Sequence, residues 1–106
     1  MFSIDQDNKI KLTKGDTAVF NCTVVDNTET IRTPVEGDVL TLSIDDTDFS
    51  KEANIDNGNY IFAIYGNETE QIESGVYYYR VVLNTADNEQ YTIIQDAFID
   101  LLGDGE

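Results

Sequence analysis

The sequence of 106 residues contains no histidine, a single cysteine and only 6 basic residues. Without histidine, the chain lacks the commonest general base at neutral pH and the commonest metal ligand. Catalytic arrangements that pair serine or cysteine with histidine are therefore excluded. The lone cysteine, Cys22, cannot form a disulfide within the chain, so the fold must be stable without a covalent cross-link, as in a reducing cytoplasm.

Long apolar segments are also missing. The longest uninterrupted apolar run is Tyr60–Tyr65, whereas a membrane-spanning helix needs roughly 20 such residues. Residues Met1–Asp5 have neither the basic region nor the apolar stretch of a signal peptide. The sequence therefore predicts a protein that is neither exported nor inserted in a membrane.

Acidic residues far outnumber basic ones, 21 to 6, which gives a net charge of -15. This charge repels phosphate backbones and anionic lipids, so we expect neither nucleic acid nor a membrane as a partner. Such a charge indicates outward faces that are solvated by water. The alternative interpretation is that the acidic residues bind a cation or a basic protein partner. The candidate carboxylates Asp45, Asp46 and Asp48 lack the spacing of a calcium loop, and we predict no enzyme activity, metal or cofactor.

Apolar and polar residues alternate along most of the chain, which is the pattern of half-buried β-strands. The segments with this pattern are Asn8–Leu12, Thr17–Val25, Val39–Ile44, Tyr60–Ile64, Val76–Leu83, Tyr91–Ile94 and Phe98–Leu101. Turn-forming residues separate them, and the only proline, Pro34, lies between strands. The pattern predicts one domain over residues 1–106, an all-β, immunoglobulin-like β-sandwich of about seven antiparallel strands.

Two segments depart from the alternation. Asn67–Glu70 has the signature of one short helical turn that connects two strands. Residues 94–102 fit a strand and an amphipathic helix almost equally, and their β-forming residues favour the strand. Residues 103–106 are expected to form a mobile tail.

The segment Glu73–Tyr77 has the spacing of a tyrosine corner, in which a tyrosine hydroxyl bonds to the backbone a few residues upstream. Tyr77 is the candidate for this role. Tyr79 stands where antibody domains have the second cysteine of the disulfide between the sheets, and Cys22 stands where the first would be. We therefore expect packing to replace the disulfide, with Cys22 a buried, inert thiol.

The strand that follows Gly75 has a second set of alternate residues. If Tyr77 and Tyr79 point inward, the residues that point outward are Val76, Tyr78, Arg80 and Val82. Two valines and a tyrosine are unusual on a solvated face of so acidic a chain, which indicates a contact surface with another subunit. The alternative is that flanking loops or Arg80 cover this face, and Arg80 is expected to pair with an acidic neighbour.

Three blocks of the sequence resemble a known family: Lys14–Phe20, Glu36–Leu42 and Gly75–Ile94. Together they are similar to small immunoglobulin-like virion proteins of tailed phages and prophages of Gram-positive bacteria, akin to the N-terminal domain of phage baseplate upper proteins. The resemblance covers nearly the whole chain. It departs from the family at two points: Arg80 stands where the family has an aspartate after Gly-x-Tyr-x-Tyr, and the last hairpin has Asp87-Asn88 where the family has Asp-Gly.

The resemblance implies a non-enzymatic structural or accessory protein of the virion, in the baseplate, the tail or the capsid surface, made in the cytoplasm of the bacterial host. The implied partners are other virion proteins, or further copies of the chain in an oligomer such as a trimer. No catalytic residues carry over from the family. The alternative function is a cell-surface or secreted adhesion module that binds carbohydrate, protein or calcium, against which the missing export signal argues.

Overall fold

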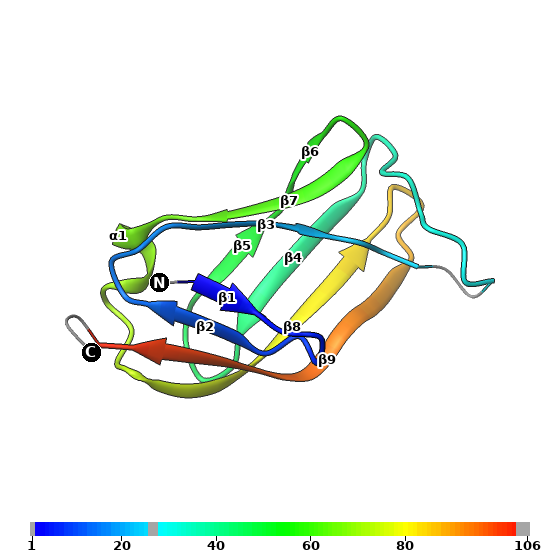
Figure 1. The fold of residues 1–106 in the computed structure, drawn as a ribbon. Coiled ribbons are helices and arrows are strands. Elements are labelled where there is room, and N and C mark those ends of the chain that lie inside the picture. Colours follow the sequence, from blue (N-terminus) through cyan, green and yellow to red (C-terminus); the bar gives the residue numbers. More distant parts are fainter. Residues whose placement is uncertain (1, 26–27, 104–106) are drawn as a thin grey trace.

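The computed structural model describes residues 2–25 and 28–103, which form strands and one helical turn. In chain order the elements are β1 (Phe2–Ile4), β2 (Ile10–Thr13), β3 (Ala18–Cys22), β4 (Val39–Ile44), β5 (Ser50–Glu52), β6 (Asn54–Asp56), β7 (Asn59–Ile64), α1 (Gly66–Thr69), β8 (Gly75–Asn84) and β9 (Gln90–Leu102). They build two sheets packed face to face (Figure 1), so the predicted fold class, an immunoglobulin-like β-sandwich, is confirmed.

The two sheets differ in size. The large sheet has 6 strands in the order β1-β2-β9-β8-β4-β5, and the small sheet has 3 strands in the order β3-β7-β6. Paired strands run antiparallel except β2 and β9, which run parallel, with Ile10 beside Ile99. The prediction of an entirely antiparallel sandwich was therefore wrong at this pair. Alternation tells which face a residue takes, but it carries no information about the direction of the neighbouring strand.

The core lies between the sheets and is built from the apolar members of the alternating segments. The predicted inward residues of β4 are Leu40, Leu42 and Ile44, and all three are buried. The largest fully buried side chains are Tyr60, Tyr79, Phe62, Ile10, Leu12, Leu40, Leu42, Ile44, Ile64, Leu83, Ile99 and Leu101. Each such aliphatic or phenylalanine side chain contributes about 1.5–3 kcal/mol relative to the exposed state, so the inward faces dominate the stability of the sandwich.

Two predicted strands at the end of the chain form the single strand β9, so residues 94–102 belong to a strand and not to a helix. β9 is irregular in its middle. Its pairing with β8 shifts in register between Tyr79 and Val81, and Asp96 has φ 58°. Such a bulge inserts extra residues on one strand and breaks the two-residue period, which explains why the pattern looked like two separate strands.

Three strands, β1, β5 and β6, were not predicted. Each has 3 residues, too few to show an alternation. Only Ala53 separates β5 from β6, and its N–H donates a 2.8 Å hydrogen bond to the carbonyl oxygen of Leu40. The chain therefore crosses from the large sheet to the small sheet within one residue.

The predicted helical turn at Asn67–Glu70 is present as α1, which begins one residue earlier. The Glu68 carboxylate accepts a 2.8 Å hydrogen bond from the N–H of Tyr65, and the N–H of Glu68 donates to the Tyr65 carbonyl oxygen at 2.9 Å. This reciprocal pair closes the turn. No helix among the described residues is long and apolar enough to span a bilayer.

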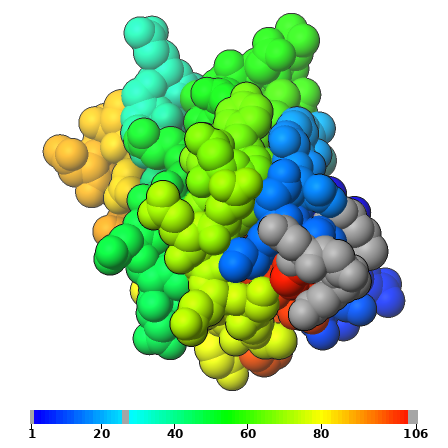
Figure 2. Space-filling view, turned by 90° about the vertical axis from the view of Figure 1, so that its left-hand side faces the viewer, coloured from blue at the N-terminus to red at the C-terminus, as the bar shows by residue number. Residues whose placement is uncertain are grey.

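Gly66 lies at a close approach between α1 and the turn that joins β2 to β3. A Cβ atom at Gly66 would sit 2.1 Å from the carbonyl oxygen of Gly15, so a larger residue would force the two segments apart. Figure 2 looks onto this end of the molecule, where the lime-coloured α1 segment lies beside the blue β2–β3 turn. Of the predicted mobile tail, residues 104–106 lie outside the described residues.

Candidate functional site

The outer face of the large sheet carries exposed apolar side chains of β8. Val76 is 59% exposed and Tyr78 is 51% exposed. Arg80 is exposed on the same face, and Val82 is half-buried because β4 and β9 flank it on both sides. The residues predicted to point outward therefore do share one face of the sandwich.

Phe98 of β9 extends this face, and sequence reasoning missed it. It pairs with Tyr78 across the two strands, and the ring centroids lie 4.6 Å apart with the ring planes 32° apart. Phe98 is 39% exposed, so this aromatic pair lies on the surface and not in the core. The alternation of buried Ala97 and Ile99 around Phe98 is the signal that could have found it. We call Val76, Tyr78, Val82 and Phe98 the outer patch.

Arg80 lies beside the outer patch and pairs with the predicted kind of partner, the acidic residue Asp45. Its Nη2 lies 3.3 Å from Oδ1 of Asp45. A solvent-exposed pair of this kind contributes only about 0–1 kcal/mol, so it orients the guanidinium more than it stabilises the fold. The patch thus has an apolar centre next to a charged rim, which is the usual composition of a protein–protein interface.

Tyr77 points away from the outer patch and makes the bond expected of a tyrosine corner. Its hydroxyl donates a 2.7 Å hydrogen bond to the carbonyl oxygen of Glu73. The bond spans the segment just before β8 and fixes the direction in which the chain enters that strand. The role of Tyr77 is therefore to hold β8 in place, on the side opposite the patch.

Cys22 and Tyr79 both line one groove between the two sheets. Tyr79 is buried, and its hydroxyl donates to the carbonyl oxygen of Asn8. Cys22 is half-buried and not fully buried as predicted, because β3 is an edge strand and the groove opens beside it. Burial still raises the pKa of the Cys22 thiol to about 11, so the thiol is protonated at neutral pH and unreactive.

A buried charged cluster, which sequence reasoning missed, joins the two sheets. The Asp38 side chain is 1% exposed and accepts hydrogen bonds from Arg32 Nη2 (3.0 Å), the Val35 N–H (3.1 Å) and the Tyr60 hydroxyl (2.7 Å). Burial alone would raise the pKa of Asp38, but these hydrogen bonds outweigh it and lower the pKa. Burial, together with the bond to Asp38, raises the pKa of Tyr60 to about 12. Because the Asp38 carboxylate is bonded to Arg32, Val35 and Tyr60, we assign this cluster a role in holding the fold together.

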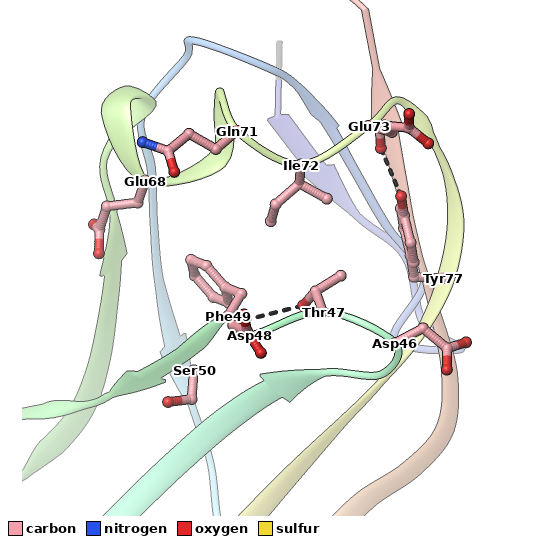
Figure 3. A pocket seen from close by; sticks show the side chains of 10 residues that line it. All are labelled: Asp46, Thr47, Asp48, Phe49, Ser50, Glu68, Gln71, Ile72, Glu73 and Tyr77. Carbon is pink, nitrogen blue, oxygen red and sulfur yellow. Dashed lines mark hydrogen bonds between the residues drawn. The ribbon is translucent and has the colours of Figure 1, made fainter.

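The predicted carboxylates Asp46 and Asp48 line a shallow hollow of about 520 Å³ near α1, with Glu68 and Glu73. Figure 3 shows the carboxylates of Asp46, Glu68 and Glu73 pointing away from one another. A backbone hydrogen bond from Tyr65, and next the side chain of Lys51, lower the pKa of Glu68 against the effect of burial. In residues 2–25 and 28–103, no cluster of three or more cysteine, aspartate or glutamate residues is arranged to hold a metal ion.

Comparisons with known proteins identify no relative by sequence: no family model matches the chain, and no curated protein matches it. Among solved structures, murine CRIg matches 97% of this chain and 96% of that chain, with a TM-score of 0.41 and 11% sequence identity. A likeness this weak carries no argument about function. The class that the strand order defines is an immunoglobulin-like β-sandwich module, and the resemblance to phage virion proteins stays a prediction.

Proposed function

We propose that this chain is a non-enzymatic structural or accessory protein of a phage virion, a component of the baseplate, the tail or the capsid surface. It assembles through protein–protein contacts made by the outer patch. The observation that carries the proposal is the exposure of Val76, Tyr78 and Phe98 on one sheet face of a chain with a net charge of -15. Contact with another subunit would remove this apolar surface from water.

The composition of the outer patch supports contact with protein. Tyrosine and arginine are enriched at interfaces, and Tyr78 and Arg80 lie on the same face here. Both sit on a sheet, which presents them in a fixed arrangement. Two other exposed apolar residues, Ile31 and Val35, lie in the β3–β4 loop and not on a sheet face.

The groups that could carry out chemistry have other roles, which supports a non-enzymatic function. Burial raises the pKa of the Cys22 thiol to about 11, which makes the nucleophilic thiolate still rarer at neutral pH than in a free cysteine. Asp38 is held by Arg32 and Tyr60, and Glu68 is held by Lys51 at 3.0 Å. The phage assignment itself is supported by the three sequence blocks, of which the last contains β8.

Mass spectrometry of phage particles from the organism that encodes this chain tests the proposal. We expect the chain to follow the major tail or baseplate proteins through a density gradient at a constant ratio. Its absence from the particles, or an amount that does not follow the other virion proteins, would contradict the proposal. Light scattering on the purified chain then shows whether the partner on the outer patch is a second copy, because the mass would be a multiple of the monomer mass.

A further inference from the structure

β3 is the edge strand of the small sheet, and within residues 2–25 and 28–103 no strand pairs with its outer edge. It pairs with β7 alone, from Ala18 opposite Ile64 to Cys22 opposite Tyr60. In an antiparallel pair, alternate residues direct their N–H and C=O groups away from the partner strand. Across residues 2–25 and 28–103, no other strand pairs with this edge, because β1 pairs with β2 in the large sheet.

This edge lacks the features that usually protect an edge strand, which are charges, proline, bulges or a very short length. β3 contains no charged residue and no proline, and its pairing with β7 has no register shift. The other edge strands, β1, β5 and β6, have only 3 residues each, and β5 carries Lys51 and Glu52 while β6 carries Asp56. β3 belongs to the uncharged segment Thr17–Val25, in a chain where 25% of residues are charged.

A groove of about 470 Å³ lies beside this edge, between the two sheets. Its walls and base are mainly apolar side chains, among them Phe20, Cys22, Phe62, Tyr79, Ile93 and Ile94. On the facing half of β9, no strand of the described part of the chain pairs with the outer edge, because β2 pairs with β9 only from Ile99 onward. A strand added to β3 would direct every second side chain into the groove.

β1 shows which side chains this region accepts. Phe2 stacks on Phe20 with ring centroids 5.3 Å apart, and Ile4 lines the groove. Phe2 and Ile4 are alternate residues of one strand, and they face the buried side of the large sheet, opposite Leu12 and Ile10. Phe2 therefore shows that an apolar side chain can pack on Phe20, and Ile4 forms part of the apolar lining of the groove.

We propose that the β3 edge is a strand-addition site for an extended segment of another polypeptide. The segment has apolar side chains at every second position and basic residues at its ends. A row of backbone donors and acceptors is complemented by a second peptide backbone, which makes a peptide the matching ligand. The net charge of -15 favours a basic partner and disfavours a second copy of this chain.

Hydrogen exchange by NMR on the full chain tests the site, with the peptide acetyl-Lys-Val-Thr-Val-Thr-Val-Lys-amide as the probe. We expect the outward-directed amides of β3 to exchange at least about tenfold more slowly with saturating probe, because they enter a new ladder. The amides of Val76 and Tyr78 serve as the internal reference and should not change. A backbone N-methylated version of the probe keeps the side chains but cannot form the ladder, so it should bind at least about tenfold more weakly.

Two matched variants locate the site. Val19 is 59% exposed on β3, and Val35 is 54% exposed in the β3–β4 loop. Val19→Lys places a repelling charge on the edge and should weaken probe binding at least about tenfold, whereas Val35→Lys adds the same charge elsewhere and should leave binding unchanged.

Four results would overturn the site. They are no slowing of β3 exchange at millimolar probe, equal binding of the N-methylated probe, protection confined to the outer patch, and slowing of β3 exchange by the chain alone at high concentration. The last result would mean that a second copy occupies the edge. None of these results bears on the outer patch as an assembly surface except the third, which would favour it.

Discussion

The two long sides of the sandwich are closed in different ways. On one side, β5 passes into β6 through Ala53 alone, so the chain itself closes the gap between the sheets. On the other side, β3 and the first half of β9 line a groove, and no strand among the described residues joins them. We call the groove the open side and the rest of the contact between the sheets the closed side.

The difference extends to the contacts that link the sheets. The closed side has directional links: the Tyr60 hydroxyl bonds to Asp38 at 2.7 Å, and Lys51 Nζ lies 3.0 Å from the Glu68 carboxylate. The open side has aromatic packing, with the Phe20 ring 5.5 Å from that of Phe62. Directional bonds fix one arrangement, whereas an apolar groove can also receive side chains from a partner. The directional bonds that stabilise the fold and the proposed binding edge therefore lie in different parts of one small core.

The largest effect is expected at the closed side, from Asp38→Asn. The change leaves the Arg32 guanidinium without its counter-charge, and breaking a buried pair costs about 3 kcal/mol. The urea midpoint should fall accordingly. Asp46→Asn is the control, because Asp46 is exposed and has φ 63°, which asparagine tolerates. Equal losses of stability in the two variants would contradict the conclusion that the closed side stabilises the fold most.

We next compare the stabilisation by the Tyr60 hydroxyl on the closed side with that by the Tyr79 hydroxyl on the open side. Tyr60→Phe removes a bond to a charged acceptor and should cost about 2 kcal/mol, whereas Tyr79→Phe removes a bond to a neutral carbonyl and should cost about 1 kcal/mol. Thermal and urea unfolding measure both values. If Tyr79→Phe costs more than Tyr60→Phe, the directional links do not dominate on the closed side.

Acid should weaken the closed side through Asp38. Its pKa is lowered in the folded state, so its contribution is present above the unfolded pKa of about 3.9 and is lost as the pH falls through the folded value. The stability difference between the natural chain and Asp38→Asn should therefore shrink from pH 5 to pH 2, by about 1.4 kcal/mol per unit of pKa lowering. Taking the difference cancels the acidic residues common to both chains. A difference that stays constant over this range would contradict the assignment.

The smallest effect is expected at the Lys51–Glu68 pair. Lys51→Met should cost no more than about 1 kcal/mol, because the pair is only partly buried and the methionine keeps most of the apolar stem. The loss should decrease as sodium chloride screens the pair. A loss as large as that of Asp38→Asn would show that this pair also fixes the closed side.

Much of the fold could be predicted from the sequence, because alternation marks inward residues wherever a strand is long enough. The inward set Leu40, Leu42 and Ile44, and the outward residue Tyr78, follow from it. Residues in short strands, such as β5 and β6, give no such signal. The partner of Asp38 could not be inferred either, since the contact between Asp38 and Tyr60 spans 22 positions and depends on how the two sheets pack.

The outer patch was predicted only in part for a similar reason. The residues on β8 follow from one period, but Phe98 lies on β9, beyond the bulge at Asp96. Alternation with Ala97 and Ile99 could place Phe98 on the outer face, but its position beside Tyr78 depends on the register between the two strands. The unpaired edge of β3 could not be predicted from the sequence either, because the sequence does not reveal that β1 joins the large sheet.

The most direct test of assembly through the outer patch is the amount of a Tyr78→Ser/Phe98→Ser double variant in purified particles, measured by mass spectrometry. The control is Ile31→Ser/Val35→Ser, which removes apolar side chains of similar exposure from the β3–β4 loop. With unfolding midpoints showing both variants folded, the double variant should fall to about one-tenth of the natural amount or less, and the control should remain at the natural level. Incorporation of the double variant at the natural level would contradict the account.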